Sequence, residues 1–421
     1  MPQNATEVHN TYSPFAHPVY VMAKPVGSAC NMRCTYCYYL EKAQELKSEV
    51  KESVMSLETL EHYIRQYLEC QTTECVLFTW HGGEPLLRGI EFYQRVVELE
   101  QKWARGRRVD NCIQTNGTLL TPEWARFFAQ HEWLVGVSVD GDEEQHDALR
   151  HMSANPTSGS HTLIMRGIDM LNQAGVMWNA MATVNALNAQ EPERFYNFFV
   201  SHGCQYIQFT PVVERRVLSG SRKGLLAMPN DDERNAELTP WSVTPDVWGQ
   251  FLCRLFDQWV RRDVGRIFVQ TFDATLANWV GEQPGVCTLA KTCGHASVME
   301  HNGDVYSCDH FVFPEYRLGN INTSTLTEMM YNPQQQAFGN AKHDTLPRQC
   351  RECQWLFACN GECPKNRIIH TATGEPGLNY LCQGYRQFFE HVAPYMDYMK
   401  QQLLQQQPPA NIMQAIRRGE L

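Results

Sequence analysis

The chain has 421 residues, of which 43% are hydrophobic, so it is long enough for two or three domains with proper cores. Its formal net charge of −10 disfavours nucleic acid and anionic membrane surfaces as main partners, because both require a basic footprint. No window approaches the roughly 18 uninterrupted apolar residues of a membrane helix, and residues 1–18 lack the charged and apolar regions of a signal peptide. We therefore expect a soluble protein of the cytoplasm.

Residues 19–214 predict strand–helix units that repeat about six times. Each strand is a short apolar run that ends in a polar or glycine-rich turn, and amphipathic helices lie between the strands. Ser56 is a candidate cap for the first helix, and Pro122 lies in the first turn of the third. The expected strands are 19–26, 75–85, 109–120, 133–141, 178–185 and 206–214, and the expected helices are 55–69, 90–104, 121–131, 161–175 and 191–203.

This alternation is typical of a parallel sheet with crossover helices. Six units make a partial (β/α)6 barrel of the TIM type, not a closed eightfold one, and in such barrels the chemistry lies at the C-terminal ends of the strands. Five segments follow or end predicted strands: the loop 28–40 and the turns HGGEP, QTNG, SVDG and FTPVV. We therefore expect these five segments to converge on one site.

The rest of the chain divides by composition. Residues 214–245 are polar and contain glycine, which is typical of an inserted loop, and helices are expected at 248–265 and 385–406. The predicted domains are an N-terminal segment 1–18, the partial barrel 19–245, linking helices 246–286, a cysteine-rich domain 287–385, and a C-terminal helix and tail 386–421.

Three cysteines, Cys30, Cys34 and Cys37, have the spacing C-x3-C-x2-C directly after the first strand. In a reducing cytosol, 16 cysteines are not a disulfide framework, so closely spaced ones are candidate metal ligands. Structural zinc closes a shell of four ligands, and no fourth ligand is obvious here. A 4Fe–4S cluster on three cysteines leaves one iron open for a reactant, and the triplet favours this interpretation.

Eight further cysteines lie in the last third of the chain. Four thiolates complete one zinc site or one 4Fe–4S cluster, so two structural zinc knuckles are an alternative at this point. The other five cysteines are predicted to be small buried hydrophobic residues. The eight are Cys287, Cys293, Cys308, Cys350, Cys353, Cys359, Cys363 and Cys382; the five are Cys70, Cys75, Cys112, Cys204 and Cys253.

The cysteine triplet, with Tyr36 just before its last member, resembles the radical S-adenosylmethionine (SAM) superfamily. The GGEP turn after the second strand resembles the methionine-binding turn of that superfamily, and the eight later cysteines resemble its SPASM extension. Together with QTNGTLL, VSVDG and GDVYSCDHF, the pattern resembles the anaerobic sulfatase-maturating enzymes over the whole chain from about residue 12.

The resemblance implies three 4Fe–4S clusters and SAM as cofactors. Cys30, Cys34 and Cys37 would hold the catalytic cluster, whose open iron SAM would chelate. One auxiliary cluster would take Cys287, Cys293, Cys308 and Cys363, and the other Cys350, Cys353, Cys359 and Cys382. The implied SAM contacts are Tyr36, Gly83, Ser138, Arg150 and Val213, and the family often has Leu at the last position.

The resemblance also implies the reaction. A 5′-deoxyadenosyl radical would take a hydrogen atom from Cβ of a cysteine or serine in an unfolded sulfatase segment of the pattern C/S-x-P-x-R, and Cα-formylglycine would result. Asp309, next to Cys308, would be the general base, although by itself it could be a structural aspartate. An electron donor such as flavodoxin or ferredoxin would be a second partner.

Three other functions are compatible with parts of the sequence. A radical SAM enzyme that forms thioether or carbon–carbon crosslinks in peptides is disfavoured by Asp309 and the whole-chain resemblance. A glycyl-radical activase does not need two auxiliary cysteine sets. A zinc-bearing scaffold without activity would contain zinc and no iron. His81 stands where some relatives have glutamine, and no role is assigned to it.

Overall fold

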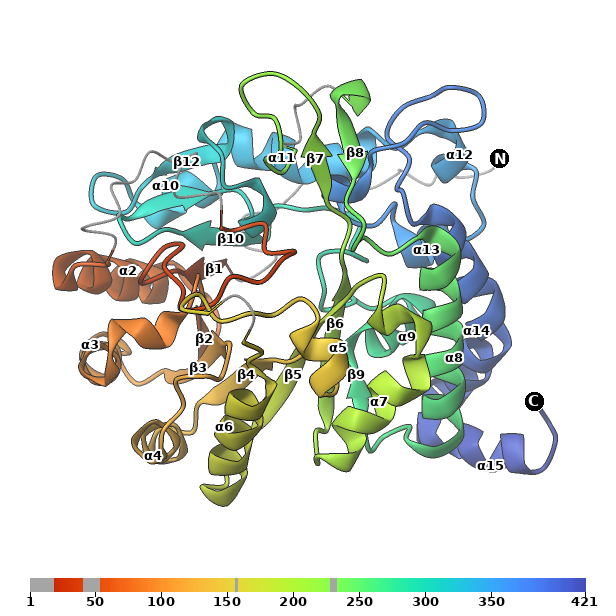
Figure 1. Cartoon of the computed structure of the whole chain (residues 1–421), viewed down its shortest axis with the longest axis horizontal. Coiled ribbons are helices and arrows are strands. Elements are labelled where there is room, and N and C mark those ends of the chain that lie inside the picture. Colours follow the sequence, from red (N-terminus) through yellow and green to blue (C-terminus); the bar gives the residue numbers. More distant parts are fainter. Residues whose placement is uncertain (1–18, 41–53, 156–157, 228–232) are drawn as a thin grey trace, which may run out of the picture.

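The structure is a computed structural model that describes residues 19–40, 54–155, 158–227 and 233–421. The predicted N-terminal segment 1–18 lies outside the described residues. In the described chain, ten strands form one sheet in the order β12-β11-β10-β1-β2-β3-β4-β5-β6-β9 (Figure 1). The short strands β7 and β8 form a second sheet.

Strands β1 to β6 form the predicted partial barrel, because each runs parallel to the next and helices connect them around the outside (Figure 1). Within the described ranges, β1 and β6 pair onward with β10 and β9 and not with each other. The strands are β1 (Tyr20–Ala23), β2 (Cys75–Trp80), β3 (Arg108–Thr115), β4 (Leu134–Ser138), β5 (Trp178–Val184), β6 (Tyr206–Pro211) and β9 (Phe268–Val269). The helices are α2 (Leu57–Cys70), α3 (Ile90–Trp103), α4 (Pro122–Gln130), α5 (Glu143–Asp147), α6 (His161–Gln173) and α7 (Pro192–Ser201).

Local signals set the helix boundaries. The Ser56 side chain accepts the Thr59 N–H at 3.0 Å and caps α2, and Pro122 occupies the first turn of α4 as expected. Helix α8 (Pro245–Arg262) begins earlier than predicted, because Pro245 suits the first turn of a helix. Helix α14 (Cys382–Leu404) also begins earlier than predicted, and it packs beside α8 (Figure 1).

The cysteine-rich region extends the barrel sheet, which the sequence did not predict because its strands are very short. Strand β10 (Ala296–Met299) runs parallel to β1, and β11 (Asp304–Tyr306) and β12 (Arg317–Asn320) follow it antiparallel. Asp309, three residues beyond β11, nevertheless reaches the C-terminal end of β1, where it contacts Lys24. The remaining helices are α9 (Gln270–Val280), α10 (Leu326–Met330), α11 (Pro333–Asp344), α12 (Arg348–Arg351), α13 (Leu356–Cys359) and α15 (Ile412–Arg417).

The expected loop 214–245 is partly ordered into the hairpin of β7 (Arg215–Val217) and β8 (Ala236–Leu238). None of the helices in the described ranges is long and apolar enough to cross a membrane.

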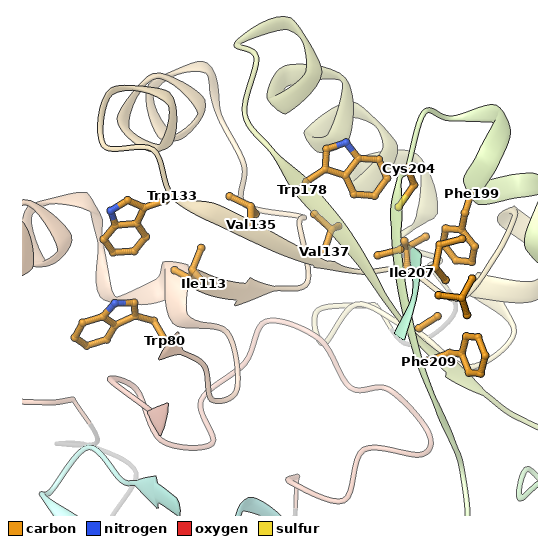
Figure 2. Packing of buried hydrophobic residues seen from close by; sticks show 14 of the residues in the cluster. Trp80, Ile113, Trp133, Val135, Val137, Trp178, Phe199, Cys204, Ile207 and Phe209 are labelled. Carbon is orange, nitrogen blue, oxygen red and sulfur yellow. The ribbon is translucent and has the colours of Figure 1, made fainter. Parts of the chain in front are cut away.

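Large apolar side chains on successive strands form the core. Figure 2 shows Trp80 on β2, Ile113 on β3, Val135 on β4 and Trp178 on β5, all of them buried. Full burial of a side chain of the Val, Leu, Ile or Phe kind contributes about 1.5–3 kcal/mol, so this layer holds the strand ends in fixed positions.

The five scattered cysteines are mostly covered by protein. Cys204 and Cys253 are buried, and Cys70 and Cys112 are partly buried. The prediction was wrong for Cys75, which is exposed at the first residue of β2 and donates its thiol hydrogen to Asp110 at 3.1 Å.

Candidate functional site

The loop after β1 carries the cysteine triplet. The Met32 N–H donates to Cys30 Sγ at 3.3 Å, and the Cys37 N–H donates to the Cys34 carbonyl at 3.0 Å, so the loop folds back on itself. Burial raises the pKa of the Cys30 thiol to about 11 and that of Cys34 to about 12. As thiolates these cysteines need a compensating positive charge, which a metal centre supplies.

The donor geometry fits a cluster better than a single ion. Across the described ranges, no three His, Cys, Asp or Glu side chains converge as the ligands of one metal ion do. Tetrahedral zinc requires that convergence, whereas a 4Fe–4S cluster binds each cysteine at a different iron. The zinc interpretation of the cysteine sets is therefore disfavoured.

The GGEP turn after β2 packs directly on the cysteine loop. The Gly83 N–H donates to the Gly27 carbonyl at 2.8 Å, and a Cβ on Gly83 would lie 2.1 Å from the Ala29 carbonyl oxygen. Only glycine permits this close approach. Glu84 is buried and accepts hydrogen bonds from the N–H groups of Leu86 and Asn116, at 2.9 and 2.7 Å, so it fixes the turn to the end of β3.

Arg150 and Tyr36 meet at Asp140, just beyond the end of β4. Asp140 accepts Arg150 Nε at 2.8 Å and Nη2 at 3.2 Å, and it also accepts the Tyr36 hydroxyl. Burial alone would raise the pKa of Asp140, but Arg150 outweighs it and lowers that pKa. The guanidinium edge formed by Nε and Nη2 is therefore occupied by the protein's own carboxylate, so a cofactor carboxylate would meet the Nη1 side.

The other two predicted SAM contacts also lie at strand ends. Ser138, the last residue of β4, accepts Gln114 Nε2 at 3.0 Å. Val213 follows β6, and its carbonyl accepts Lys365 Nζ at 3.0 Å. Lys365 also forms an ion pair with Glu214 and follows Cys363 and Pro364 in the chain, so the cysteine-rich region contacts the barrel rim here.

In the structure, the cysteines predicted to hold each auxiliary cluster lie near one another. The first set is Cys287, Cys293, Cys308 and Cys363, and the second set is Cys350, Cys353, Cys359 and Cys382. For the first set, burial and then the neighbouring thiols of Cys363 and Cys287 raise the pKa of Cys308. Burial, then Glu362 and the thiols of Cys287 and Cys293, raise the pKa of Cys363. The second set lines one cavity of about 370 Å³ beside Trp355, Tyr385 and Phe389, and its members there are Cys350, Cys353, Cys359 and Cys382.

Asp309 lies between the side chains of Lys24 and Tyr38, for which no role was predicted. One carboxylate oxygen is paired with the Lys24 ammonium, and the other accepts the Tyr38 hydroxyl. Lys24 has a side chain only 1% exposed and follows β1 directly. Burial would raise the pKa of Asp309, but Lys24, followed by His81 and His310, outweighs it and holds that pKa well below its usual range.

A second carboxylate completes this cluster. Glu300, which follows β10, lies 3.8 Å from Lys24 Nζ and accepts the Tyr39 hydroxyl. Lys24 Nζ also lies 3.4 Å from the centre of the Tyr39 ring. The sequence did contain a signal for Lys24: a lysine directly follows an apolar strand, at the end of the barrel where the chemistry is expected. Glu300 and Tyr38 gave no signal, because their partners are far away in the chain.

His81, at the end of β2, also faces this cluster. Its Nδ1 accepts the Gly82 N–H at 2.7 Å. Burial lowers the pKa of His81, and the nearby Asp309 counteracts this by raising it. No role was predicted for this histidine, yet it lies near Asp309 and Lys24.

Comparisons with known proteins agree with this geometry. Residues 25–199 match the model of the radical SAM superfamily, and residues 292–354 match that of an iron–sulfur cluster-binding domain named SPASM. A serine-type anaerobic sulfatase-maturating enzyme of Bacteroides thetaiotaomicron is 59% identical, with 98% of each chain covered. A cysteine-type counterpart of Clostridium novyi is 32% identical over 92% of this chain and 98% of its own. The solved structure of native anSMEcpe with bound AdoMet and Cp18Cys peptide superposes with a TM-score of 0.79 at 27% identity, covering 92% of this chain and all of that one.

Proposed function

This chain belongs to the anaerobic sulfatase-maturating enzymes of the radical SAM superfamily, and from that membership we propose that it oxidises a serine of an unfolded sulfatase segment to Cα-formylglycine. The preference for serine is supported by the 59% identity to a serine-type relative, against 32% to a cysteine-type one. Cysteine is the second candidate target residue, because the cysteine-type relatives match over nearly the same length.

The cofactors are SAM and 4Fe–4S clusters, in the radical SAM and SPASM domains. When bound, they supply a 5′-deoxyadenosyl radical that removes a hydrogen atom from Cβ of the target residue. The cysteines of the loop after β1 are the proposed ligands of the catalytic cluster, and the two sets of four are those of the auxiliary clusters. The proposed SAM contacts are Tyr36, Gly83, Ser138, Arg150 and Val213.

Asp309 is the proposed general base. After Cβ has lost a hydrogen atom, the oxidation still requires the loss of one proton from the hydroxyl or thiol and of one electron. Asp309 is held ionised by Lys24, so it is ready to accept that proton, and it adjoins Cys308, a proposed cluster ligand beside which the electron would leave. A serine yields the aldehyde directly; a cysteine yields a thioaldehyde, which water converts to the aldehyde with release of hydrogen sulfide.

The observation that carries this proposal is the juxtaposition of Asp309 with the end of β1, from which the cysteine loop starts. It results from the parallel pairing of β1 with β10, which joins the two cysteine-bearing parts of the chain in one sheet. A base beside both a radical source and an auxiliary thiolate set is the arrangement that this oxidation needs.

The test is anaerobic incubation of the reconstituted enzyme with SAM, a reductant and synthetic peptides. Three peptides differ only at the target position and carry S-x-P-x-R, C-x-P-x-R or A-x-P-x-R. Mass spectrometry with an aldehyde-reactive probe should detect formylglycine in the serine peptide first, and none in the alanine peptide. A product that is crosslinked and contains no aldehyde would replace this proposal by the crosslinking alternative.

The remaining partners and the compartment are also proposals. A small acidic or flavin electron carrier, flavodoxin or ferredoxin, would reduce the catalytic cluster. The cytoplasm is supported by the 16 cysteines, all of which are free thiols. The net charge of −10 supports the proposal that neither nucleic acid nor a membrane surface is a partner.

A further inference from the structure

Two cations beside the first auxiliary set, the buried Lys342 and the partly buried Arg367, donate only to backbone carbonyls among the described residues. Lys342 on α11 is 1% exposed, and its ammonium donates to the carbonyls of Cys287 at 2.6 Å and Thr288 at 2.8 Å. The Arg367 guanidinium donates to the carbonyls of Gly361 at 3.0 Å and Lys342 at 2.6 Å. Among the described residues, neither cation forms an ion pair with a carboxylate.

Both cations lie against the cysteines of the first set. The Cys293 N–H donates to the Gly339 carbonyl of α11 at 3.0 Å, which holds the helix of Lys342 beside that cysteine. Arg367 donates a hydrogen bond to the turn between Cys359 and Cys363. Its guanidinium adjoins thiols of both sets: Cys350 of the second set, and Cys293 and Cys363 of the first. Buried charge is tolerated where an opposite charge compensates it.

One buried carboxylate partly offsets them. Glu362 is 2% exposed, and its Oε2 accepts the side-chain amides of Asn366 at 3.2 Å and Asn379 at 2.6 Å. Two cations against one anion still leave an excess of positive charge around the first set. The charged residues that line the cavity of the second set, Glu352 and Arg386, are instead exposed, where water and salt screen them.

We propose that Lys342 is the counter-ion of the first auxiliary cluster and raises its reduction potential above that of the second, while Arg367 is a counter-ion shared by both clusters. A cluster on four thiolates is an anion and becomes more negative on reduction, so fixed buried cations favour the reduced state. The proposal rests on the proposed function in one respect: this cluster takes up the single electron that the substrate loses after its hydrogen atom and proton have gone. A higher potential at the first cluster makes it the better acceptor.

The test measures potentials and does not depend on turnover. Full-length protein in which Cys30, Cys34 and Cys37 are alanine leaves only the auxiliary clusters for an anaerobic redox titration followed by electron paramagnetic resonance. In this background Lys342→Gln should shift one auxiliary potential to more negative values and Arg367→Gln should shift both, with iron and sulfide content retained. Lys291→Gln is the matched control, because Lys291 lies between Cys287 and Cys293 in sequence but is exposed.

Unchanged potentials in both neutral variants at full iron content would overturn the proposal. If the neutral variants lose iron, the charge-conserving variants Lys342→Arg and Arg367→Lys distinguish a role of the charge from a role of the hydrogen bonds. Retention of iron in that pair supports a counter-ion role, whereas equal loss shows that the hydrogen-bond geometry matters and the charge does not. If the potentials shift as expected while the peptides are not oxidised, the counter-ion role stands and the proposed function fails.

Discussion

Each carboxylate oxygen of Asp309 has one partner in this structure, Lys24 at one and Tyr38 at the other. A base in this position is fully ionised before the substrate arrives, because Lys24 keeps its pKa low. Each carboxylate oxygen can accept more than one hydrogen bond, so a substrate hydroxyl can approach Asp309 while both contacts persist.

Asp309→Asn keeps the shape of the side chain and removes the base. Hydrogen-atom abstraction needs only the radical and a positioned peptide, so 5′-deoxyadenosine should still form. Formylglycine should fall by about 10²–10⁴-fold, the usual contribution of a general base. The measurement is the ratio of 5′-deoxyadenosine to formylglycine in protein shown to keep its full iron content. An unchanged ratio with both products intact would remove Asp309 from the mechanism.

Tyr38→Phe tests whether the second contact orients the base. The ring can remain packed against His310, 5.2 Å away between centroids, while Asp309 loses a hydrogen-bond donor. A hydrogen bond to a charged group is worth about 1.5–3 kcal/mol, so formylglycine formation should slow by roughly 10–100-fold with little change in SAM cleavage. Tyr39→Phe is the matched control, because its hydroxyl bonds to Glu300. Equal effects of the two variants would mean that only packing is involved.

At the scale of elements, local patterns predicted the barrel well. Strands such as β2 and β5 and helices such as α3 and α6 depend on hydrophobic periodicity and turn residues, which a sequence displays directly. Strands β10 to β12 escaped prediction because strands of three or four residues carry almost no periodicity. The pairing of these strands also shapes the site, because the pairing of β10 with β1 joins the parts of the chain that carry Asp309 and Lys24. Such long-range pairing leaves no local signal.

Helix α3 carries a buried carboxyl group whose protonation should affect stability. Glu100 is 5% exposed; its Oε2 accepts Asn111 Nδ2 at 2.8 Å, and its Oε1 has no partner among the described residues. Burial raises the pKa of Glu100 from 4.5 to about 8. The folded state therefore binds this proton more tightly than the unfolded state, so its contribution to stability is complete below pH 4.5 and is lost as the pH rises to about 8.

Glu100→Gln supplies the uncharged form at every pH. Relative to wild type, the variant should gain stability between pH 4.5 and about 8, by at most about 1.4 kcal/mol per pH unit. The measurement is the difference in thermal unfolding midpoint between the two proteins across this range, under anaerobic conditions. Glu98→Gln, on the exposed face of the same helix, is the control and should show no such trend. Parallel pH profiles for wild type and Glu100→Gln would contradict the prediction.

At the scale of the whole molecule, one sheet carries both the barrel and the start of the cysteine-rich region (Figure 1). The division into domains at residues 245 and 287 stays a prediction, because the strands cross from one part to the other without a break in pairing. The contacts of Lys365 with Val213 and Glu214 tie the two parts together again, just after the C-terminal end of β6. The auxiliary thiols are therefore held rigidly against the end of the barrel.

Which cysteines share a cluster could not be worked out from spacing, since the two sets interleave along the chain. Cys363 lies between Cys359 and Cys382 in sequence, yet its thiol neighbours are Cys287 and Cys293. The resemblance implies this arrangement, and the assignment of the cysteines to two clusters stays a prediction. The partition of iron between the three cysteine sets can be tested by removing one set at a time.

Eleven cysteines in sets of three, four and four predict three clusters and about twelve irons per chain. Replacing Cys30, Cys34 and Cys37 by alanine should remove one third of the iron and all SAM cleavage, because the open iron is lost. Replacing Cys350, Cys353, Cys359 and Cys382 by alanine should also remove one third of the iron but leave SAM cleavage measurable, because these thiols line a separate cavity away from the cysteine loop. The measurements are iron and sulfide content and 5′-deoxyadenosine under reducing anaerobic conditions. SAM cleavage that survives in the first variant, or iron that is lost from all sites in the second, would show that the cysteines are not divided in this way.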